Sequence, residues 1–322
     1  MKSINTKILI TGASGNLGKV LIQHLSGNGY THVTACYCNH AENLPNFPGV
    51  TWQKLDILDV IALEDIIQEN EIIIHLAGIV SYQARDKSKI LKINIEGTLN
   101  VANVANAASV NKLIHISSTA ALGIPTEPRM LDESYIPDPT QFITDYALSK
   151  WYGELEVWRA MSEGLNAIIL APSLMLNPAD KFANTAVFKN KIKEGLSYFP
   201  AGSSGFVLAQ DVSKAIISMI ENNIGEEKII LNAGNLSWHS FFTIIANKLD
   251  INTEFKGVPS YYMKLLSIRN KFKTVFGLPV SVPTAMAKQM QQELSYNGSL
   301  ITELLPFRYT SLEKAIDEYC AS

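Results

Sequence analysis

The chain has 322 residues, of which 47% are hydrophobic and 18% are charged, and this composition is typical of a folded globular protein. Its 27 lysines and arginines are balanced by 30 aspartates and glutamates, so it lacks the basic excess of a nucleic-acid-binding protein. The three cysteines form no CxxC pair, which argues against a disulfide framework and against a metal site. We find no signal-peptide pattern and no apolar stretch of the roughly 20 residues that cross a bilayer, and we expect a cytoplasmic protein without a membrane partner.

Short apolar runs alternate with segments of helical period through the first half of the chain. The runs predict strands at 7–11, 32–37, 51–54, 71–76, 112–117 and 167–170, and the helical segments lie at 16–26, 60–68, 87–108 and 145–162. This alternation is typical of a parallel sheet with helices on both faces. The sequence therefore predicts a doubly wound, Rossmann-type α/β fold.

The regular alternation ends after Pro172, where prolines and glycines separate shorter segments. We predict a nucleotide-binding domain at 1–171, to which 206–233 return through a strand at 228–231. Residues 172–205 and 234–322 are predicted to form a smaller, mostly helical substrate-binding lobe. Within this lobe, residues 261–276 interleave basic and apolar side chains. Such a segment is either a lid over the substrate pocket or a helix on an anionic membrane surface, and the acidic balance of the whole chain favours the lid.

A glycine-rich turn joins the first predicted strand to the first predicted helix. Gly12 suits a tight turn, Gly15 lets the backbone approach a pyrophosphate, and Gly18 lets the helix pack on the sheet. The helix N-terminus then faces the anion. A glycine triplet in this strand–turn–helix context predicts dinucleotide binding.

The GxxGxxG spacing of this turn, the run His75-Leu76-Ala77-Gly78, Asn94, and the run Tyr146-Ala147-Leu148-Ser149-Lys150 together resemble the extended short-chain dehydrogenase/reductases of the NAD(P)-dependent epimerase/dehydratase superfamily. The resemblance covers nearly the whole chain and is strongest to members like dihydroflavonol reductases and 3-beta-hydroxysteroid dehydrogenases. It implies that Asn94 braces the active site and a bound water. It also implies a set of cofactor contacts: Gly12, Ser14, Gly15, Asn16, Leu17, Gly18, Asn39, His40, Asp56, Ile57, Leu76, Ala77, Gly78, Tyr146, Lys150, Pro172 and Ser173.

Tyr146 and Lys150 are four residues apart on a predicted helix, so their side chains share one face. An ammonium beside a phenol favours the phenolate, and we expect the pKa of Tyr146 to fall. Tyr146 would then act as general acid or base on a carbonyl or an alcohol. Aligning the strand end at 115–123 with the family selects Ser118 to polarise the substrate oxygen, with Thr119 as the alternative.

The residues at three further positions of the sequence indicate the cofactor and substrate preference. Residues 36–40, where the second predicted strand ends, include neither an acid to accept the ribose hydroxyls nor an arginine to bind the 2′-phosphate, and Asn39 and His40 are the candidate phosphate contacts. The missing acid favours NADP over NAD. Ala120 and Ala121 stand where the resemblance places an acid pair in sugar-nucleotide dehydratases, and Ala171 stands where many relatives have arginine. We therefore expect a hydrophobic ketone, or the matching alcohol, in a pocket lined by Val80, Ser81, Tyr82, Thr119, Met175 and Phe206.

Two other functions remain open from the sequence. An NDP-sugar epimerase that keeps its NAD would use the same catalytic residues, whereas a dinucleotide-binding regulator would need no proton donor, so the trio Ser118, Tyr146 and Lys150 argues against a regulator. The catalytic helix also carries a second apolar stripe, which includes Trp151, Leu155 and Trp158. Such a stripe needs a partner, and it predicts a homodimer.

Overall fold

The computed structural model describes residues 4–39, 44–127, 129–178, 186–225, 227–259, 262, 265–270 and 283–321. In this part of the chain, seven strands form one sheet in the order β11-β7-β5-β4-β1-β2-β3, and every neighbouring pair is parallel. The strands are β1 (Ile8–Thr11), β2 (Val33–Tyr37), β3 (Val50–Lys54), β4 (Ile72–His75), β5 (Lys112–Ile116), β7 (Ala167–Pro172) and β11 (Glu227–Leu231). The order reverses beside β1, as the doubly wound fold requires. The predicted fold class is therefore confirmed.

The central strands β1, β4, β5 and β7 are buried on both faces, because they are almost continuously apolar. Successive side chains of a strand point to opposite faces, so Ile8 and Ile10 of β1 join one core cluster while Leu9 joins the other. The same division holds in β4, where Ile73 packs on the opposite side from Ile72 and Ile74. Two cores, one on each face, thus hold the sheet and fix the positions at which its strands end.

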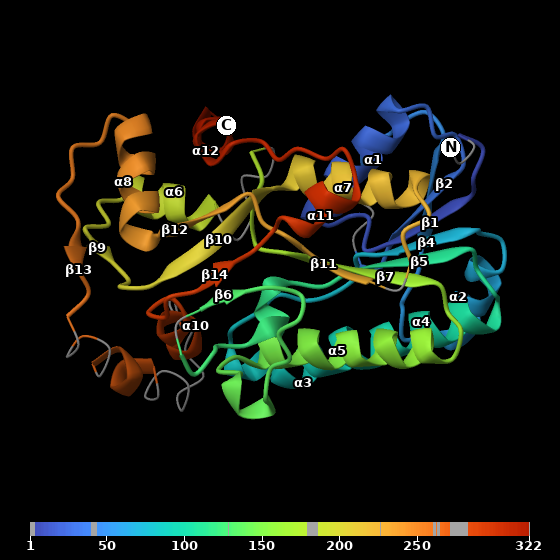
Figure 1. Cartoon of the computed structure of the whole chain (residues 1–322), viewed down its shortest axis with the longest axis horizontal. Coiled ribbons are helices and arrows are strands. Elements are labelled where there is room, and N and C mark those ends of the chain that lie inside the picture. The colour runs from blue at the N-terminus through green and yellow to red at the C-terminus, as the bar shows by residue number, and fades with distance from the viewer. Residues whose placement is uncertain are drawn as a thin grey trace.

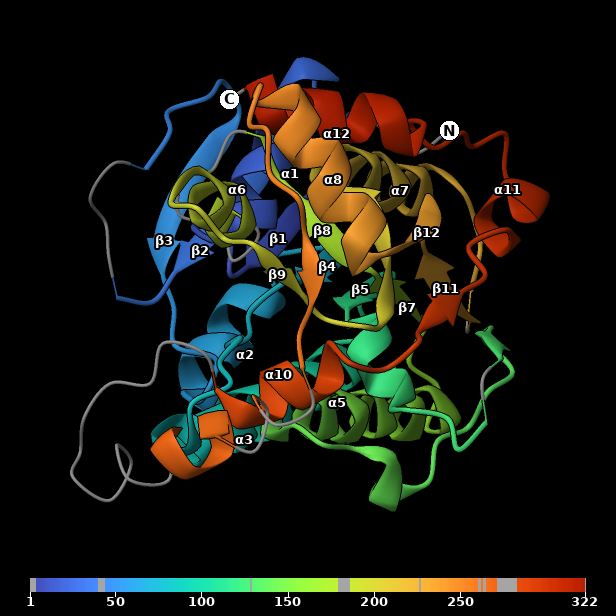
Figure 2. The same cartoon turned by 90° about the vertical axis from the view of Figure 1, so that its left-hand side faces the viewer.

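Helices cover both faces of this sheet (Figures 1 and 2). On one face α1 (Asn16–Gly27) packs against α7 (Ala209–Glu221). On the other face α4 (Gly97–Ala107) packs between α2 (Val60–Ile67) and α5 (Asp145–Ser162). Thr144 caps the N-terminus of α5, since its side chain accepts a hydrogen bond from Ala147 N, and this cap sets where Tyr146 lies in the first turn.

The predicted continuous helix at 87–108 is interrupted in the structure. It consists of α3 (Lys87–Leu91), the π-helical segment η2 (Lys92–Glu96) and α4. Helix α5 crosses η2 closely, because a Cβ on Gly153 would lie 2.7 Å from the carbonyl oxygen of Asn94. A π-helical turn in a helix often marks a functional site, and here it contains Asn94.

The smaller lobe is built on the three-stranded sheet β12-β10-β8, formed by β8 (Leu174–Leu176), β10 (Ser203–Leu208) and β12 (Gly234–Ser237). Pairs β9–β13 (Tyr198–Phe199, Lys256–Gly257) and β6–β14 (Met130–Leu131, Ser295–Tyr296) flank it.

Short 3-10 turns lie in the first half of the chain, at Ala84–Asp86, Thr119–Leu122 (η3) and Pro139–Gln141. Described helices in the second half of the chain include α6 (Ala186–Lys193), α8 (Trp238–Lys248), α10 (Thr284–Gln289), α11 (Leu300–Leu304) and α12 (Leu312–Ala321).

The structure places the segment 206–233 in two parts. Strand β10, which contains Phe206, pairs within the small sheet, whereas α7 packs on α1 and β11 joins the main sheet beside β7. The return to the nucleotide-binding domain therefore begins at Ala209. Most of the predicted lid segment 261–276 lies outside the described residues, and no helix in the described part of the chain is long and apolar enough to cross a membrane.

Two histidines lie inside the main sheet. The rings of His75 and His115 stack with their centroids 5.2 Å apart. His75 bonds Thr11 and Thr98, at 2.7 and 3.1 Å, while neither ring nitrogen of the buried His115 has a hydrogen-bond partner. Burial, with the charge of Lys150, lowers the pKa of His75 to about 3. Burial, with His75 and Lys150, holds the pKa of His115 well below its usual range.

We expect these histidines to make the fold sensitive to acid. The unfolded chain binds protons near pH 6.5, whereas the native rings stay neutral, so stability is lost as the pH falls below 6.5. His75 alone accounts for about 2 kcal/mol between pH 7 and pH 5. Urea unfolding at both pH values measures this loss, and His115→Leu should make it smaller. Equal free energies of unfolding at pH 7 and 5 would contradict the assignment of neutral buried rings.

Candidate active site

The turn between β1 and α1 has a backbone that only glycine fits. Gly12 has φ +69°, and a Cβ there would lie 2.6 Å from the backbone nitrogen of Ala77 in the segment after β4. Gly15 precedes the first turn of α1 and has no side chain to occupy its free amides. The amides at this helix N-terminus are therefore available to a phosphate group.

Gly18 has a different neighbour from the one predicted. A Cβ at Gly18 would lie 2.3 Å from the carbonyl oxygen of Ala13, so this glycine lets α1 pack against the turn that precedes it and not against the sheet itself. The close approach of Gly12 to Ala77 and that of Gly18 to Ala13 fix the conformation of the turn. Gly12 and Gly18 together therefore keep open the space in front of the α1 N-terminus.

Several of the predicted cofactor residues face one cavity of about 220 Å³ at the carboxyl ends of the strands. Asn16 and Leu17 of α1 line it together with Pro172 and Ser173 at the end of β7. Among the described residues, Asn16 Oδ1 and Ser173 Oγ are buried without a hydrogen-bond partner. Unpaired buried polar atoms are costly, so these two fit a polar ligand that completes their hydrogen bonds.

The predicted cofactor residues described next do not line this cavity. Ser14, Leu76 and Ala77 are half-buried, and Gly78 is exposed beside Lys150, since a Cβ there would lie 3.6 Å from Lys150 Nζ. Asp56 is exposed after β3, and its Oδ1 accepts from Leu58 N. The side chain of Ile57 is buried against Gly97 and belongs to the core, and its contact with a cofactor stays a prediction. Asn39 is exposed after β2, and His40 lies outside the described residues.

Tyr146 and Ser118 meet at this cavity. Ser118 ends the segment after β5 and caps η3, where its Oγ accepts from Ala120 N at 3.1 Å. Its own proton is then free for Tyr146, and the two side chains share a hydrogen bond. The Tyr146 ring also packs edge-on against Tyr82, with ring centroids 5.9 Å apart. Thr119, the alternative to Ser118, is turned to Tyr296, with which it shares a hydrogen bond.

Lys150 is buried one helical turn after Tyr146. Its Nζ donates to the carbonyl oxygen of Ile116 at the end of β5, at 2.9 Å. Burial lowers the pKa of Lys150 to about 8, and the charge of Glu154 opposes that effect. Burial also raises the pKa of Tyr146, against the opposing hydrogen bond from Ser118. The expected fall in the pKa of Tyr146 is thus wrong for the protein alone, because removing the phenol from water outweighs the favourable neighbours.

Asn94 connects the elements around this pair. From η2, its Nδ2 donates to Ser149 Oγ at 2.9 Å and to Ile79 O at 3.0 Å, while its Oδ1 accepts from Ile79 N at 2.7 Å. Ser149 in turn donates to Tyr146 O. Asn94 therefore fixes α5 to the segment after β4, and its predicted contact with a water stays a prediction.

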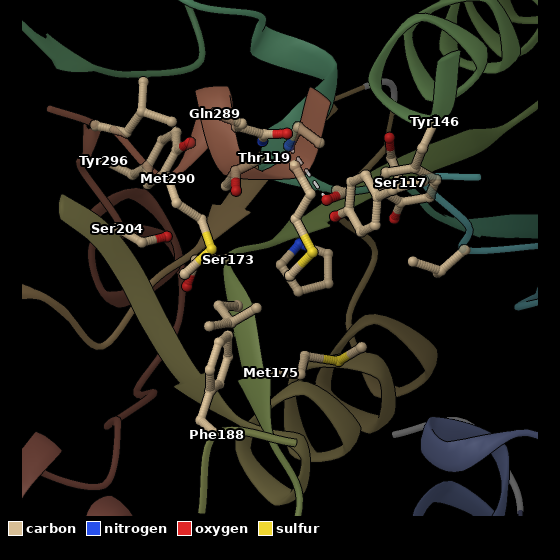
Figure 3. Close-up of a pocket in the computed structure, with 18 of the residues that line it drawn as sticks. Ser117, Thr119, Tyr146, Ser173, Met175, Phe188, Ser204, Gln289, Met290 and Tyr296 are labelled. Carbon is tan, nitrogen blue, oxygen red and sulfur yellow. Dashed lines mark hydrogen bonds between the residues drawn. The ribbon is translucent and has the colours of Figure 1, made fainter. Parts of the chain in front are cut away.

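The substrate side of the cavity combines predicted and unpredicted residues (Figure 3). Val80, Tyr82, Thr119 and Met175 line it as predicted, whereas Phe206 does not. Phe206 is fully buried and stacks on Phe241 of α8 at 4.4 Å in the core of the smaller lobe. Ser81 lies outside this cavity and donates to Asp86. Lining residues that sequence reasoning missed come from the smaller lobe: Phe188, Ser203, Ser204, Trp238, Met286, Gln289, Met290, Leu294 and Tyr296.

Comparison with known families decides which group this site belongs to. Residues 8–234 match the model of the NAD dependent epimerase/dehydratase family. The chain belongs to the NAD dependent epimerase/dehydratase family. The match runs from β1 to the start of β12, so it includes the glycine turn, Tyr146 and Lys150.

Individual relatives of this epimerase/dehydratase chain match between 72% and 98% of its length. It is 24% identical, over 95% of its length and 91% of the relative's, to a Synechocystis sp. protein provisionally named dihydroflavonol 4-reductase. It is 25% identical to anthocyanidin reductase of Arabidopsis thaliana, over 72% of this chain and 77% of that protein. The crystal structure of gox2253 shares the fold with a TM-score of 0.84, at 23% identity and over 98% of this chain and 97% of that one.

A nicotinamide dinucleotide is the cofactor of this epimerase/dehydratase chain. The residues present fit it: the glycine turn leaves the α1 amides uncovered, and Asn16 and Ser173 carry unpaired polar atoms beside them. The pyrophosphate would lie at the α1 N-terminus, and Gly78 lies beside Lys150, one helical turn after Tyr146.

Proposed function

We propose that this protein is an NADP-preferring reductase that interconverts an uncharged ketone or aldehyde and the corresponding alcohol. The observation that carries the proposal is the pairing of Tyr146 with Ser118 at the wall of a cavity whose described lining holds no acidic or basic side chain. A charged substrate would be poorly stabilised there. The names of the reductase relatives support the same reaction class.

The roles of the residues follow from their contacts. Tyr146 is protonated at neutral pH, because the ordinary pKa of a phenol is about 10 and burial raises it further; it is the general acid that delivers a proton to the carbonyl oxygen. Ser118 donates a hydrogen bond to the same oxygen, and Lys150 binds the ribose of the dinucleotide. The bound dinucleotide supplies the hydride. Met175, Phe188 and Met290 exclude water from the carbonyl carbon.

The preference for NADP rests on the end of β2. This strand ends at Tyr37 and is followed by Cys38 and Asn39, so the described residues offer no carboxylate there to accept both ribose hydroxyls. Titration of NADPH and NADH against intrinsic fluorescence tests this preference. We expect tighter binding of NADPH, and equal or tighter binding of NADH would oppose it.

The family also contains epimerases, and the pocket argues against that activity here. A sugar nucleotide carries a diphosphate in addition to that of the cofactor, and for this second diphosphate the described cavity lining provides no cationic side chain. A panel of apolar ketones with NADPH, assayed beside UDP-sugars, separates the two functions. Turnover of a ketone supports the proposal, and epimerisation of a UDP-sugar without ketone turnover would overturn it.

We expect the enzyme to be a homodimer that forms through α5. Part of the predicted apolar stripe is covered by the chain itself, because Trp151 packs against Phe142. Tyr152, Leu155 and Trp158 remain 39%, 41% and 37% exposed, and such a patch on one helix suits a two-fold interface. Sedimentation should show a dimer at micromolar concentration and a monomer for Leu155→Lys. A wild-type monomer would exclude this interface.

A further inference from the structure

A buried carboxylate lies one helical turn beyond Lys150 and has no part in the reaction just described. Glu154 of α5 accepts a hydrogen bond from Ser117 Oγ at 2.5 Å on one oxygen and from Lys228 Nζ at 2.7 Å on the other. The side chains of Lys228 and Glu154 are only 9% and 4% exposed. Burying such a pair has a desolvation cost that is offset only by good geometry.

The hydrogen bonds of Glu154 to Ser117 and Lys228 connect α5 to the end of β5 and to β11, next to the catalytic residues. Ser117 lies at the end of β5, immediately before Ser118, and Lys228 lies on β11 at the edge of the sheet. Lys150 is bound to the neighbouring Ile116 O on the same strand end. Glu154 and Lys150 are four residues apart on α5, so they share a helix face. The carboxylate is therefore fixed beside the catalytic lysine by contacts from β5 and from β11.

The surroundings of Lys150 make this negative charge significant. The neighbouring titratable groups are Tyr146 on the same helix, His75 on β4 and His115 on β5, and both histidines are neutral. Lys228 faces Glu154, and it also lies near Glu133, which accepts from Ile230 N. Burial drives Lys150 towards its neutral form, and Glu154 is the group that opposes it.

We propose that Glu154, held in place by Ser117 and Lys228, is a positioning residue that keeps buried Lys150 in its ammonium form. This inference rests on the proposed function, in which Tyr146 gives up its proton to the substrate oxygen and becomes a phenolate. A neutral Lys150 would no longer stabilise the Tyr146 phenolate that remains after proton delivery. The Glu154–Lys228 ion pair would then support catalysis, although neither residue touches substrate or cofactor.

The test measures the protonation of Lys150 directly and needs no substrate. Full-length protein labelled with carbon-13 at lysine Cε is titrated by NMR, and Lys150→Arg identifies the Lys150 signal. In wild type we expect a midpoint near pH 8. Glu154→Gln removes the negative charge, and its Lys150 midpoint should move to lower pH. The double variant Glu154→Gln/Lys228→Met leaves no buried unpaired lysine, and its midpoint should move in the same direction but less, because the opposing positive charge of Lys228 is removed as well.

Further variants keep the result decisive. Glu154→Asp retains the charge and should keep the midpoint close to wild type, and the double variant serves if Glu154→Gln alone does not fold. Glu163→Gln removes an exposed carboxylate from the same helix and should leave the midpoint unchanged. An unmoved midpoint in a folded Glu154→Gln variant, single or double, would overturn the proposal. Since no turnover is measured, a wrong assignment of the reaction would leave this result unaffected.

Discussion

Replacing Tyr146 by phenylalanine is expected to lower kcat for a carbonyl substrate by about 10²- to 10⁴-fold, the usual contribution of general acid–base catalysis. The ring would keep its edge-on contact with Tyr82, while the hydroxyl that shares a hydrogen bond with Ser118 would be lost. The NADPH affinity should change little, because the glycine turn that binds the pyrophosphate is untouched. Steady-state kinetics and a fluorescence titration of NADPH measure the two quantities separately.

Tyr152→Phe is the matched control for this experiment. Tyr152 lies on the same helix but is 39% exposed, away from the cavity, so its loss should leave kcat unchanged. A Tyr146→Phe enzyme as active as wild type would show that another group delivers the proton. A wild-type protein that binds NADPH but turns over no carbonyl compound would instead favour a dinucleotide-binding regulator.

The second large effect is expected at Gly12. Alanine there must adopt φ +69°, which costs about 1–2 kcal/mol, and its Cβ would lie 2.6 Å from the backbone of Ala77. Backbone cannot move aside as a flexible side chain can, so the turn must shift. We expect Gly12→Ala to weaken dinucleotide binding by at least about 100-fold, equivalent to roughly 2.7 kcal/mol, and to lower the thermal unfolding midpoint. Fluorescence titration and thermal unfolding measure both.

Gly27→Ala is the control for the loss of a glycine. Gly27 is the last residue of α1, and a Cβ there would meet no described atom within 4 Å. Alanine is favoured over glycine in a helix by about 0.5–1 kcal/mol, so this variant should be at least as stable as wild type and bind NADPH normally. Normal binding by Gly12→Ala would contradict the role assigned to the turn.

The nucleotide-binding half could be predicted from sequence because its signals are local. The central strands are short runs of β-branched and other apolar residues, and the turn at Gly12 is predicted from three glycines between a strand and a helix. Ser118 lies just after β5, and Tyr146 and Lys150 lie on α5. The packing of α5 on the parallel sheet brings these three residues together. Local pattern and tertiary structure agree here, so these predictions needed no knowledge of distant contacts.

The substrate side could not be predicted, because its residues reach the cavity through distant pairings. Tyr296 lies there since β14 pairs with β6, more than 150 residues earlier in the chain, and no local pattern encodes that register. Phe206 was placed in the pocket wall, but it packs against α8, a helix that follows some 30 residues later. The direction of the Tyr146 pKa also depends on how completely the smaller lobe covers the phenol.

The central claim is that hydride passes between a nicotinamide dinucleotide and a carbonyl carbon beside the Tyr146 hydroxyl. Incubating the enzyme with a ketone substrate and NADPH deuterated at C4, on one face and then on the other, tests it by mass spectrometry of the alcohol. The account predicts deuterium on the new carbinol carbon from one of the two labelled cofactors and none from the other. Conversion of a substrate with no deuterium in the product from either cofactor would contradict it.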